Sequence, residues 1–337
     1  MPVSAVLTGL SGWLPPRAVD NAELIERFGL APEWIPQRTG ILSRRHVDPG
    51  TATSDLAVLA AAPLVAAEPG AIDTLVLATM TPDHPCPATA PVVAARLGLT
   101  GAAAFDVNAA CAGFVHALAT AASLVVNGVA ERALVVGADA MSTIVDPADR
   151  NTAVIFGDGA AAALIEASVD GPGSFGPFDL GADGGQAGLI TIPAGGSRQR
   201  SDQTAASAAD HYLRMAGLPV FRQAVEHMAS SARRALKQAG LPAEDVDWLV
   251  AHQANRRILD AVADRLGVPA DRRAVHLDRV GNTSAASIPL ALWDLWREGR
   301  IRPGDRILLT SFGAGLAWGS TTLTWPMRPL IPIADPR

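Results

Sequence analysis

The sequence predicts a layered α/β protein built from two similar halves. Apolar stretches of strand length alternate with longer helical segments, and several of the helical segments stop at a glycine, a residue that commonly ends helices. The same order of elements occurs twice along the chain. The 337 residues are enough for two core-forming units. We therefore expect an N-terminal half over residues 1–170 and a C-terminal half over residues 171–337.

The first half should carry a largely buried sheet. Asp20-x-x-Glu23 resembles a capping box, and the helix that it opens should stop at Gly29. Pro36 and Gly40 predict a loop in the segment that contains them. Strands are expected at residues 3–9, 72–79, 102–107 and 132–137, and helices at residues 53–67, 88–97 and 112–127.

The second half should repeat this alternation after a long connection. Residues 168–210 are rich in Gly, Pro, Ser and Asp, and should hold one short strand at residues 189–192. Helices are expected at residues 219–239, 256–266 and from the turn at 279–284 to residue 297. Strands are expected at residues 246–251, 274–277, 306–311 and 316–325.

The two halves match in spacing as well as in order. The central helix of the first half runs from Cys111 to Gly128, and its counterpart runs from Asn282 to Gly299, an interval of 17 residues in both cases. Equal spacing predicts that Cys111 and Asn282 occupy matching helix starts in two facing units. His252 follows a strand, at the end where open α/β sheets place functional groups.

Composition restricts the class of protein. Hydrophobic residues make up 49% and charged residues 18%, as in a globular protein with a large core. The net charge of −6 and the isoelectric point near 5.6 argue against nucleic-acid binding. Two cysteines and an N-terminus without a basic signal region favour a reducing, cytoplasmic location. The apolar stretch 109–126 contains His116 and should be a core helix, not a membrane span.

Cys111 is the strongest candidate nucleophile. It lies where a turn of small residues becomes a helix, and the free N–H groups and positive dipole end of a helix start favour a thiolate. Its neighbours Ala109, Ala110, Ala112 and Gly113 would let a bulky acyl group approach the sulfur. The alternative is a buried cysteine that acts as a small apolar residue.

A thiol, an imidazole and a carboxamide are suitable parts for acyl transfer. A cysteine can take an acyl group from a thioester in a nearly isoenergetic exchange, because one thioester replaces another. The attack creates an oxyanion, for which the Cys111 N–H and the backbone of the turn at 313–315 are candidate donors. His252 and Asn282 can together donate two hydrogen bonds to an enolate oxygen, which would favour loss of CO2 from a malonyl thioester.

Three motifs, DVNAACAGF, HQANRRI and GNTSAASIP, resemble the active-site motifs of the β-ketoacyl-ACP synthase III family. The resemblance covers nearly the whole chain and includes WIxxRTGI at 34–41, DPADR, IFGDGA and FGAGLAWGS. It implies a thiolase-like fold of five αβαβα layers, a homodimer and no cofactor or metal. The implied reaction is a decarboxylating Claisen condensation of an acyl-CoA primer with malonyl-acyl carrier protein, which gives a 3-oxoacyl-acyl carrier protein for fatty-acid or polyketide initiation.

The resemblance also implies roles for individual residues. Cys111 would carry the acyl group, His252 and Asn282 would drive decarboxylation, and the backbone N–H groups of Cys111 and Ala314 would form the oxyanion hole. Three further sets of residues are implied to bind the substrates. The CoA-binding residues are Trp34, Arg38 and Arg150; the acyl-pocket residues are Cys86 and Phe312; the residues that meet the acidic carrier protein are Arg257, Arg222 and Arg265.

The sequence departs from the family pattern in three places. The usual triple-glycine turn reads Gly313-Ala314-Gly315, which adds a methyl group near the oxyanion. Cys86 stands where acetyl-primed members often carry a phenylalanine supplied by the partner subunit, so a longer or branched primer should fit. Asp264 replaces a basic residue on the helix expected to face the carrier protein.

The same residues also bear on several alternative functions. The nearest alternative is a relative of the same fold that passes its acyl group to a small-molecule hydroxyl or amine. A thiolase would need a second cysteine within 313–319, and a hydroxymethylglutaryl-CoA synthase would need a glutamate ahead of Cys111. A non-catalytic carrier-binding module would have lost the nucleophile. Gly157-x-Gly159-x-x-Ala162 matches a dinucleotide fingerprint only superficially, because a strand-like run follows, and it should be a turn between antiparallel strands.

Overall fold

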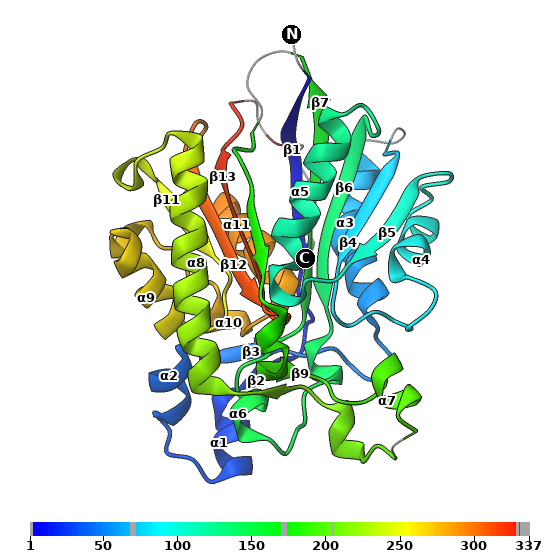
Figure 1. Ribbon diagram of the computed structural model, residues 1–337, viewed down its shortest axis with the longest axis vertical. Coiled ribbons are helices and arrows are strands. Elements are labelled where there is room, and N and C mark those ends of the chain that lie inside the picture. Colours follow the sequence, from blue (N-terminus) through cyan, green and yellow to red (C-terminus); the bar gives the residue numbers. More distant parts are fainter. Residues whose placement is uncertain (1–2, 68–71, 170–173, 204, 328–329, 331–337) are drawn as a thin grey trace.

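Two β-sheets form the framework of the chain (Figure 1). The computed structural model describes residues 3–67, 72–169, 174–203, 205–327 and 330. The first sheet has the strand order β1-β7-β6-β4-β5, with β1 (Ser4–Trp13), β4 (Thr74–Ala78), β5 (Ala103–Val107), β6 (Arg132–Asp139) and β7 (Gly159–Ser168). The second has the order β11-β12-β13-β8, with β8 (Asp179–Ala182), β11 (Trp248–Ala251), β12 (Arg306–Gly313) and β13 (Ala317–Thr324).

Helices cover both sheets and also separate them. The outer helices of the first sheet are α3 (Thr53–Ala67) and α4 (Thr89–Arg96). The helices between the sheets are α5 (Gly113–Val126) and α11 (Ser287–Arg297) (Figure 1). The outer helices of the second sheet are α8 (Gly217–Ala239) and α9 (Arg256–Leu266). This arrangement confirms the predicted αβαβα layers.

The central layer explains the apolar stretch 109–126. Helix α5 contacts both sheets, and residues such as Phe114, Val115 and Leu118 are buried in one core cluster with α11. A helix that is apolar nearly all round suits a position inside a large α/β protein. No helix in the described part of the chain is long and apolar enough to cross a membrane.

The two sheets repeat one topology. In the first sheet β4 and β6 run parallel, β7 is antiparallel to β6, and β1 is antiparallel to β7. In the second sheet β11, β12, β13 and β8 are paired in the same way. The proposed boundary between residues 170 and 171 lies outside the described residues.

The register of this repeat differs from the predicted one. The 3₁₀ turns start at residues 110 and 284, the helices after them at 113 and 287, and the next strands at 132 and 306, and each pair differs by 174. Cys111 therefore corresponds to Ala285, and Asn282 corresponds to Asn108. The prediction that Cys111 matches Asn282 was wrong because α5 has 14 residues and α11 has 11, so the glycines that follow the two helices are out of register by three.

Several predicted local elements also need correction. Residues 34–39 form helix α2 (Trp34–Thr39) in place of a loop, because Pro36 lies in its first turn, where a missing N–H costs nothing. The strand expected at 274–277 was wrong: an isolated bridge joins Leu249 to Arg273, just before this segment, and Leu277 begins helix α10 (Leu277–Val280). Asp20 precedes α1 (Asn21–Phe28), but its side chain forms no capping bond. Strand β8 was missed within the long connection.

The remaining elements are short and surround one end of the molecule. They are β2 (Ala18–Asp20), β3 (Ser43–Arg45), α6 (Arg150–Ala153), β9 (Ile190–Thr191), α7 (Ser197–Ser201), β10 (Arg214–Met215) and α10 (Leu277–Val280).

Gly157 joins the two halves and does not form a nucleotide-binding turn. Its N–H donates to the carbonyl of Asn282 at 3.0 Å, and strand β7 begins two residues later. Strand β7 is antiparallel to β6, as expected, but the predicted glycine turn between them is wrong, because a long connection with helix α6 joins the strands and Gly159 is the first residue of β7. A Cβ atom on Gly157 would overlap the backbone carbonyl of Val280. The glycine is therefore explained by a close backbone approach.

We expect Gly157→Ala to lower the free energy of unfolding by about 1–3 kcal/mol, because the added methyl group would push two backbone segments apart. Thermal or urea unfolding measures this. Gly188→Ala is the matched control, because a Cβ there has no neighbour within 4 Å. Equal midpoints for the two variants would contradict the account of this contact.

Candidate active site

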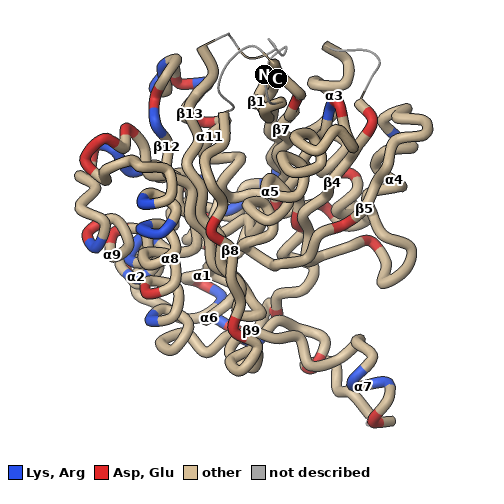
Figure 2. Tube along the Cα trace, turned by 45° about the horizontal axis from the view of Figure 1, so that its top comes forward, with Lys and Arg blue, Asp and Glu red and all other residues tan. Residues whose placement is uncertain are grey.

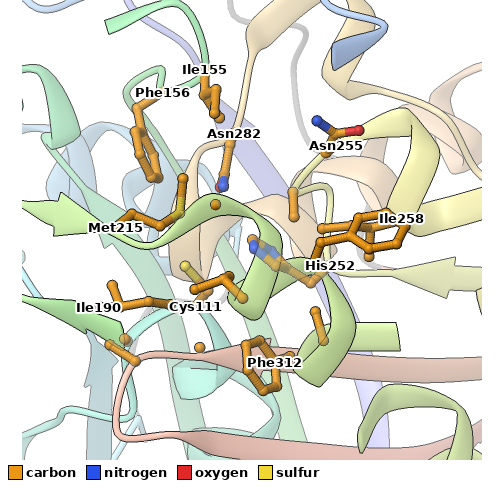
Figure 3. Close-up of a pocket in the computed structure, with 18 of the residues that line it drawn as sticks. Cys111, Ile155, Phe156, Ile190, Met215, His252, Asn255, Ile258, Asn282 and Phe312 are labelled. Carbon is orange, nitrogen blue, oxygen red and sulfur yellow. The ribbon is translucent and has the colours of Figure 1, made fainter. Parts of the chain in front are cut away.

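Cys111, His252 and Asn282 line the same cavity, which has a volume of about 360 Å³. Figure 3 shows the three side chains directed toward a common space. Cys111 comes from the 3₁₀ turn before α5, His252 follows the end of β11, and Asn282 lies in the turn before α11. The two halves thus contribute the thiol on one side and the imidazole and carboxamide on the other.

The cavity has an apolar part and a polar part. Its apolar lining includes Met80, Met141, Phe156, Ile190, Leu213 and Met215. Three polar residues also line it, namely Arg38, Asn255 and Arg257. Because Arg38 and Arg257 are exposed, the polar part is where the cavity meets solvent. An apolar chain with an anionic head would match this distribution.

The Cys111 thiol is held in its neutral form. Burial raises its pKa to about 12, the hydrogen bond to Ser284 lowers it, and the negative charge of Asp139 raises it. The sulfur lies 3.5 Å from the Ser284 hydroxyl, and Cys111 as a whole residue is partly exposed. This differs from the prediction that the helix start favours a thiolate, because burial, the largest influence on the thiol, raises its pKa in the free protein.

His252 is fixed in the neutral form on the opposite side. The residue is only 2% exposed, and burial lowers the pKa of its imidazole to about 3. Its Nδ1 lies 2.7 Å from the hydroxyl of Ser287, and its backbone N–H donates to Thr310. When Ser287 donates to Nδ1, the ring proton resides on Nε2, which is then a hydrogen-bond donor.

Asn282 has its carboxamide oriented by its own turn. The side-chain Oδ1 accepts the N–H of Ser284 at 2.9 Å. The backbone N–H of Asn282 donates to Ile155 at 2.9 Å, which anchors the turn on the first half. The side-chain Nδ2 is therefore left to donate toward the cavity.

Two residues beside His252 shape the site and were not singled out from the sequence. The side chain of Gln253 donates to Ala251 and accepts the N–H of His276, so it fixes the loop after β11. Asn255 caps helix α9 and donates to the carbonyl of Arg38. Their place in the HQAN motif was the available signal.

The backbone at the end of β12 lies against the nucleophile. A Cβ atom on Gly313 would lie 2.7 Å from the backbone nitrogen of Cys111, so only glycine leaves this N–H accessible. Ala314 follows it and also lines the cavity. Phe312, from the same strand, is buried and contributes to the wall.

The residues predicted to bind CoA lie together at the surface. The Arg38 guanidinium carbon lies 4.4 Å from the centre of the Trp34 ring, and that of Arg150 lies 5.8 Å from it. Such distances are typical of cation–π contacts. Arg38 links this cluster to the cavity, whereas Trp34 and Arg150 do not line it.

The residues predicted to meet the carrier protein lie on α8 and α9, which are neighbours (Figure 2). Arg222 and Arg257 are exposed, and Arg257 lies 6.0 Å from the Phe221 ring. Arg265 is also exposed, but it forms an ion pair with Glu226 at 2.5 Å. The three arginines are therefore not equally available to a partner.

Cys86 lies apart from the cavity that the other predicted residues form. It is exposed, and it is not among the residues that line the cavity. Its predicted role requires a second subunit. Among the described residues, no group of three or more His, Cys, Asp or Glu side chains is arranged to hold a metal ion.

Two family models match the chain. Residues 105–184 match 3-oxoacyl-[acyl-carrier-protein] synthase III, and residues 236–325 match its C-terminal part. A Streptomyces coelicolor protein named β-ketoacyl-[acyl-carrier-protein] synthase III 3 is 50% identical over 96% of this chain and 98% of its own.

Solved structures agree with these matches. The 3-oxoacyl-(acyl carrier protein) synthase III of Pseudomonas aeruginosa PAO1 has a TM-score of 0.89 and 46% identity, over 98% of this chain and all of that one. A priming β-ketosynthase from a polyketide biosynthetic pathway has a TM-score of 0.89 and 37% identity, over 97% of each chain. Together with three sequence motifs that meet at one cavity, these likenesses show that the chain belongs to the β-ketoacyl-ACP synthase III family of condensing acyltransferases.

Proposed function

We propose that this chain transfers an acyl group from acyl-CoA to Cys111 and condenses it with malonyl-acyl carrier protein. The product is a 3-oxoacyl-acyl carrier protein that starts a fatty acid or a polyketide. The observation that carries the proposal is the convergence of a thiol, an imidazole and a carboxamide on one cavity. The names of the relatives support the same reaction.

In the first step the sulfur of Cys111 attacks the thioester carbonyl. A new carbon–sulfur bond forms, the bond to the CoA sulfur breaks, and the thiol proton ends on the CoA sulfur. The backbone N–H groups of Cys111 and Ala314 stabilise the oxyanion that forms between these events. Because the free thiol is neutral, ionisation is coupled to the arrival of the substrate.

In the second step the malonyl thioester loses CO2. Nε2 of His252 and Nδ2 of Asn282 donate to the thioester oxygen, which becomes the enolate oxygen when the carboxylate leaves. The carbanion carbon then attacks the acyl group on Cys111, the carbon–sulfur bond breaks, and the sulfur leaves as a thiolate that takes a proton from solvent. A neutral imidazole suits this role. Because burial lowers the pKa of His252, the ring stays uncharged at neutral pH and keeps its Nε2–H donor.

The polar part of the cavity suits the two substrates. The Trp34–Arg38–Arg150 cluster offers a flat ring and two cations to the CoA nucleotide. Arg257 and Arg222 offer positive charge to the acidic carrier protein, with Arg265 in a lesser role because Glu226 neutralises it. We also propose a cytoplasmic homodimer without a cofactor, in which Cys86 of the partner subunit would close the apolar part and admit a primer longer than acetyl.

Mixing the purified protein with a panel of acyl-CoAs should add the mass of one acyl group, most readily from C4 to C8 primers, as recorded by intact mass spectrometry. Cys111→Ser should remain unmodified, because the attacking sulfur is gone. If acetyl-CoA outcompetes the longer primers, the proposed role of Cys86 is wrong. If the serine variant is acylated as fast as the parent, another residue is the nucleophile.

Asn282→Asp should separate the two steps. Aspartate keeps an oxygen to accept the Ser284 N–H but lacks the donor that faces the cavity. We expect acylation within a few-fold of the parent and condensation slower by about 100–1000-fold, the usual effect of losing one oxyanion donor. Single-turnover mass spectrometry of each step measures this. Equal losses in both steps would indicate that Asn282 only supports the turn.

Arg257→Gln should raise KM for malonyl-acyl carrier protein by about threefold or more, and added salt should reduce the difference. An acyl thioester of N-acetylcysteamine as primer avoids effects on CoA binding. Arg265→Gln is the matched control and should have a smaller effect, because Arg265 is already paired with Glu226. A larger effect of Arg265→Gln than of Arg257→Gln would instead place the carrier-protein contact near Arg265, at the C-terminal end of α9.

A further inference from the structure

Asp139 is a buried acid that the proposed mechanism does not use. It ends strand β6 and has no solvent exposure. Its Oδ1 accepts hydrogen bonds from the hydroxyls of Thr79 and Thr81 and from the backbone N–H groups of Met80 and Thr81, at 2.8–3.2 Å. Its Oδ2 accepts the N–H of Ala285, from the second half, at 3.0 Å. One carboxylate therefore bridges the two halves.

Ser284 connects this carboxylate to the nucleophile. The Cys111 thiol donates to the Ser284 hydroxyl, and the Ser284 side chain lowers the pKa of the Asp139 carboxyl group, as a hydrogen-bond donor to it would. A hydroxyl group has a single proton, so a serine that accepts from the thiol donates to the carboxylate. The result is an ordered line of groups from the reacting sulfur to Asp139.

The internal repeat gives an independent view of this carboxylate. Asp139 ends β6 as Gly313 ends β12, and Ala285 corresponds to Cys111. At Gly313 the absent side chain leaves space in front of the Cys111 N–H, where the oxyanion would form. At the equivalent position in the other half, the Asp139 carboxylate accepts the Ala285 N–H. A carboxyl group thus occupies the counterpart of the oxyanion site; burial raises its pKa, and the hydrogen bonds that it accepts oppose this shift.

We propose that Ser284 is a catalytic residue that hydrogen-bonds the sulfur of Cys111. Asp139 is a positioning residue: it fills the second half's counterpart of the oxyanion site and thereby holds Ser284 and the Asn282 turn in place. The proposal rests on Cys111 being the nucleophile of the proposed function. It requires no proton transfer to Asp139. The two residues act on the thiol in opposite directions. When the sulfur ionises, the Ser284 hydroxyl turns its single proton from Asp139 to the thiolate and stabilises it, whereas the negative charge of Asp139 opposes the ionisation.

Ser284→Ala and Asp139→Asn test these roles. Ser284 has a backbone φ of 51°, which is unusual for a residue other than glycine, but Ala110 occupies the corresponding position with a φ of 47°. Alanine is therefore compatible with this turn, and the variant should fold. Thr283→Val is the control, because the buried Thr283 hydroxyl has no hydrogen-bond partner among the described residues.

The first readout is the rate at which iodoacetamide alkylates Cys111 at pH 8, followed by peptide mass spectrometry so that the exposed Cys86 is counted separately. Below the pKa of the thiol this rate follows the thiolate fraction. Ser284→Ala should slow the reaction by about fivefold, the effect of one hydrogen bond. Asp139→Asn should accelerate it, and Thr283→Val should leave it unchanged.

The second readout is single-turnover condensation from the acylated protein. Both Ser284→Ala and Asp139→Asn should slow it by about tenfold or more, although their effects on alkylation are opposite. A residue that only stabilised the fold would not separate the two variants in this way. The proposal is overturned if Ser284→Ala alkylates like the parent, or if Asp139→Asn condenses like the parent. Alkylation needs no substrate, so a parent protein that fails to condense would reject the proposed function and leave this part of the test intact.

Discussion

The active site depends on the close approach of backbone segments from the two halves. Three glycines mark the contacts: a Cβ on Gly157 would overlap the Val280 carbonyl, one on Gly137 would lie 2.8 Å from the Ala285 oxygen, and one on Gly313 would lie 2.7 Å from the Cys111 nitrogen. Larger residues would separate the halves, and with them the thiol from the imidazole and carboxamide. The layered fold serves to hold these two turns together, because the central helices that follow them are packed between both sheets.

The same packing explains the electrostatic state of the site. Removal of water raises the pKa of the Cys111 thiol and lowers that of His252, so the free protein holds both groups neutral. Charge then develops only when a thioester is present, in a cavity whose donors are already oriented. Buried polar residues maintain that orientation: Ser287 bonds His252, Gln253 fixes the loop after β11, and Asn282 accepts a bond from within its own turn.

The sequence was a good guide to what local patterns determine. Apolar runs and terminal glycines predicted most strands and helices, and the three motifs predicted that Cys111, His252 and Asn282 would meet. The sequence was a poor guide to features that depend on contacts between residues far apart in the chain. The thiol pKa depends on burial by both halves, and the bond between Asp139 and Ala285 joins residues 146 positions apart. Helix α2 was missed because Pro36 is compatible with a first turn, and the repeat was misaligned because its two central helices differ in length.

The most direct test of the account is a single-turnover reaction of the isolated acyl-enzyme with malonyl-acyl carrier protein. The protein would be acylated, separated from free acyl-CoA and mixed with the second substrate, and both proteins would be followed by mass. The account predicts loss of the acyl group from Cys111 together with release of CO2 and appearance of a 3-oxoacyl-acyl carrier protein. An acyl-enzyme that malonyl-acyl carrier protein leaves intact, but that a small hydroxyl or amine compound discharges, would contradict condensation and identify a simple acyl transfer.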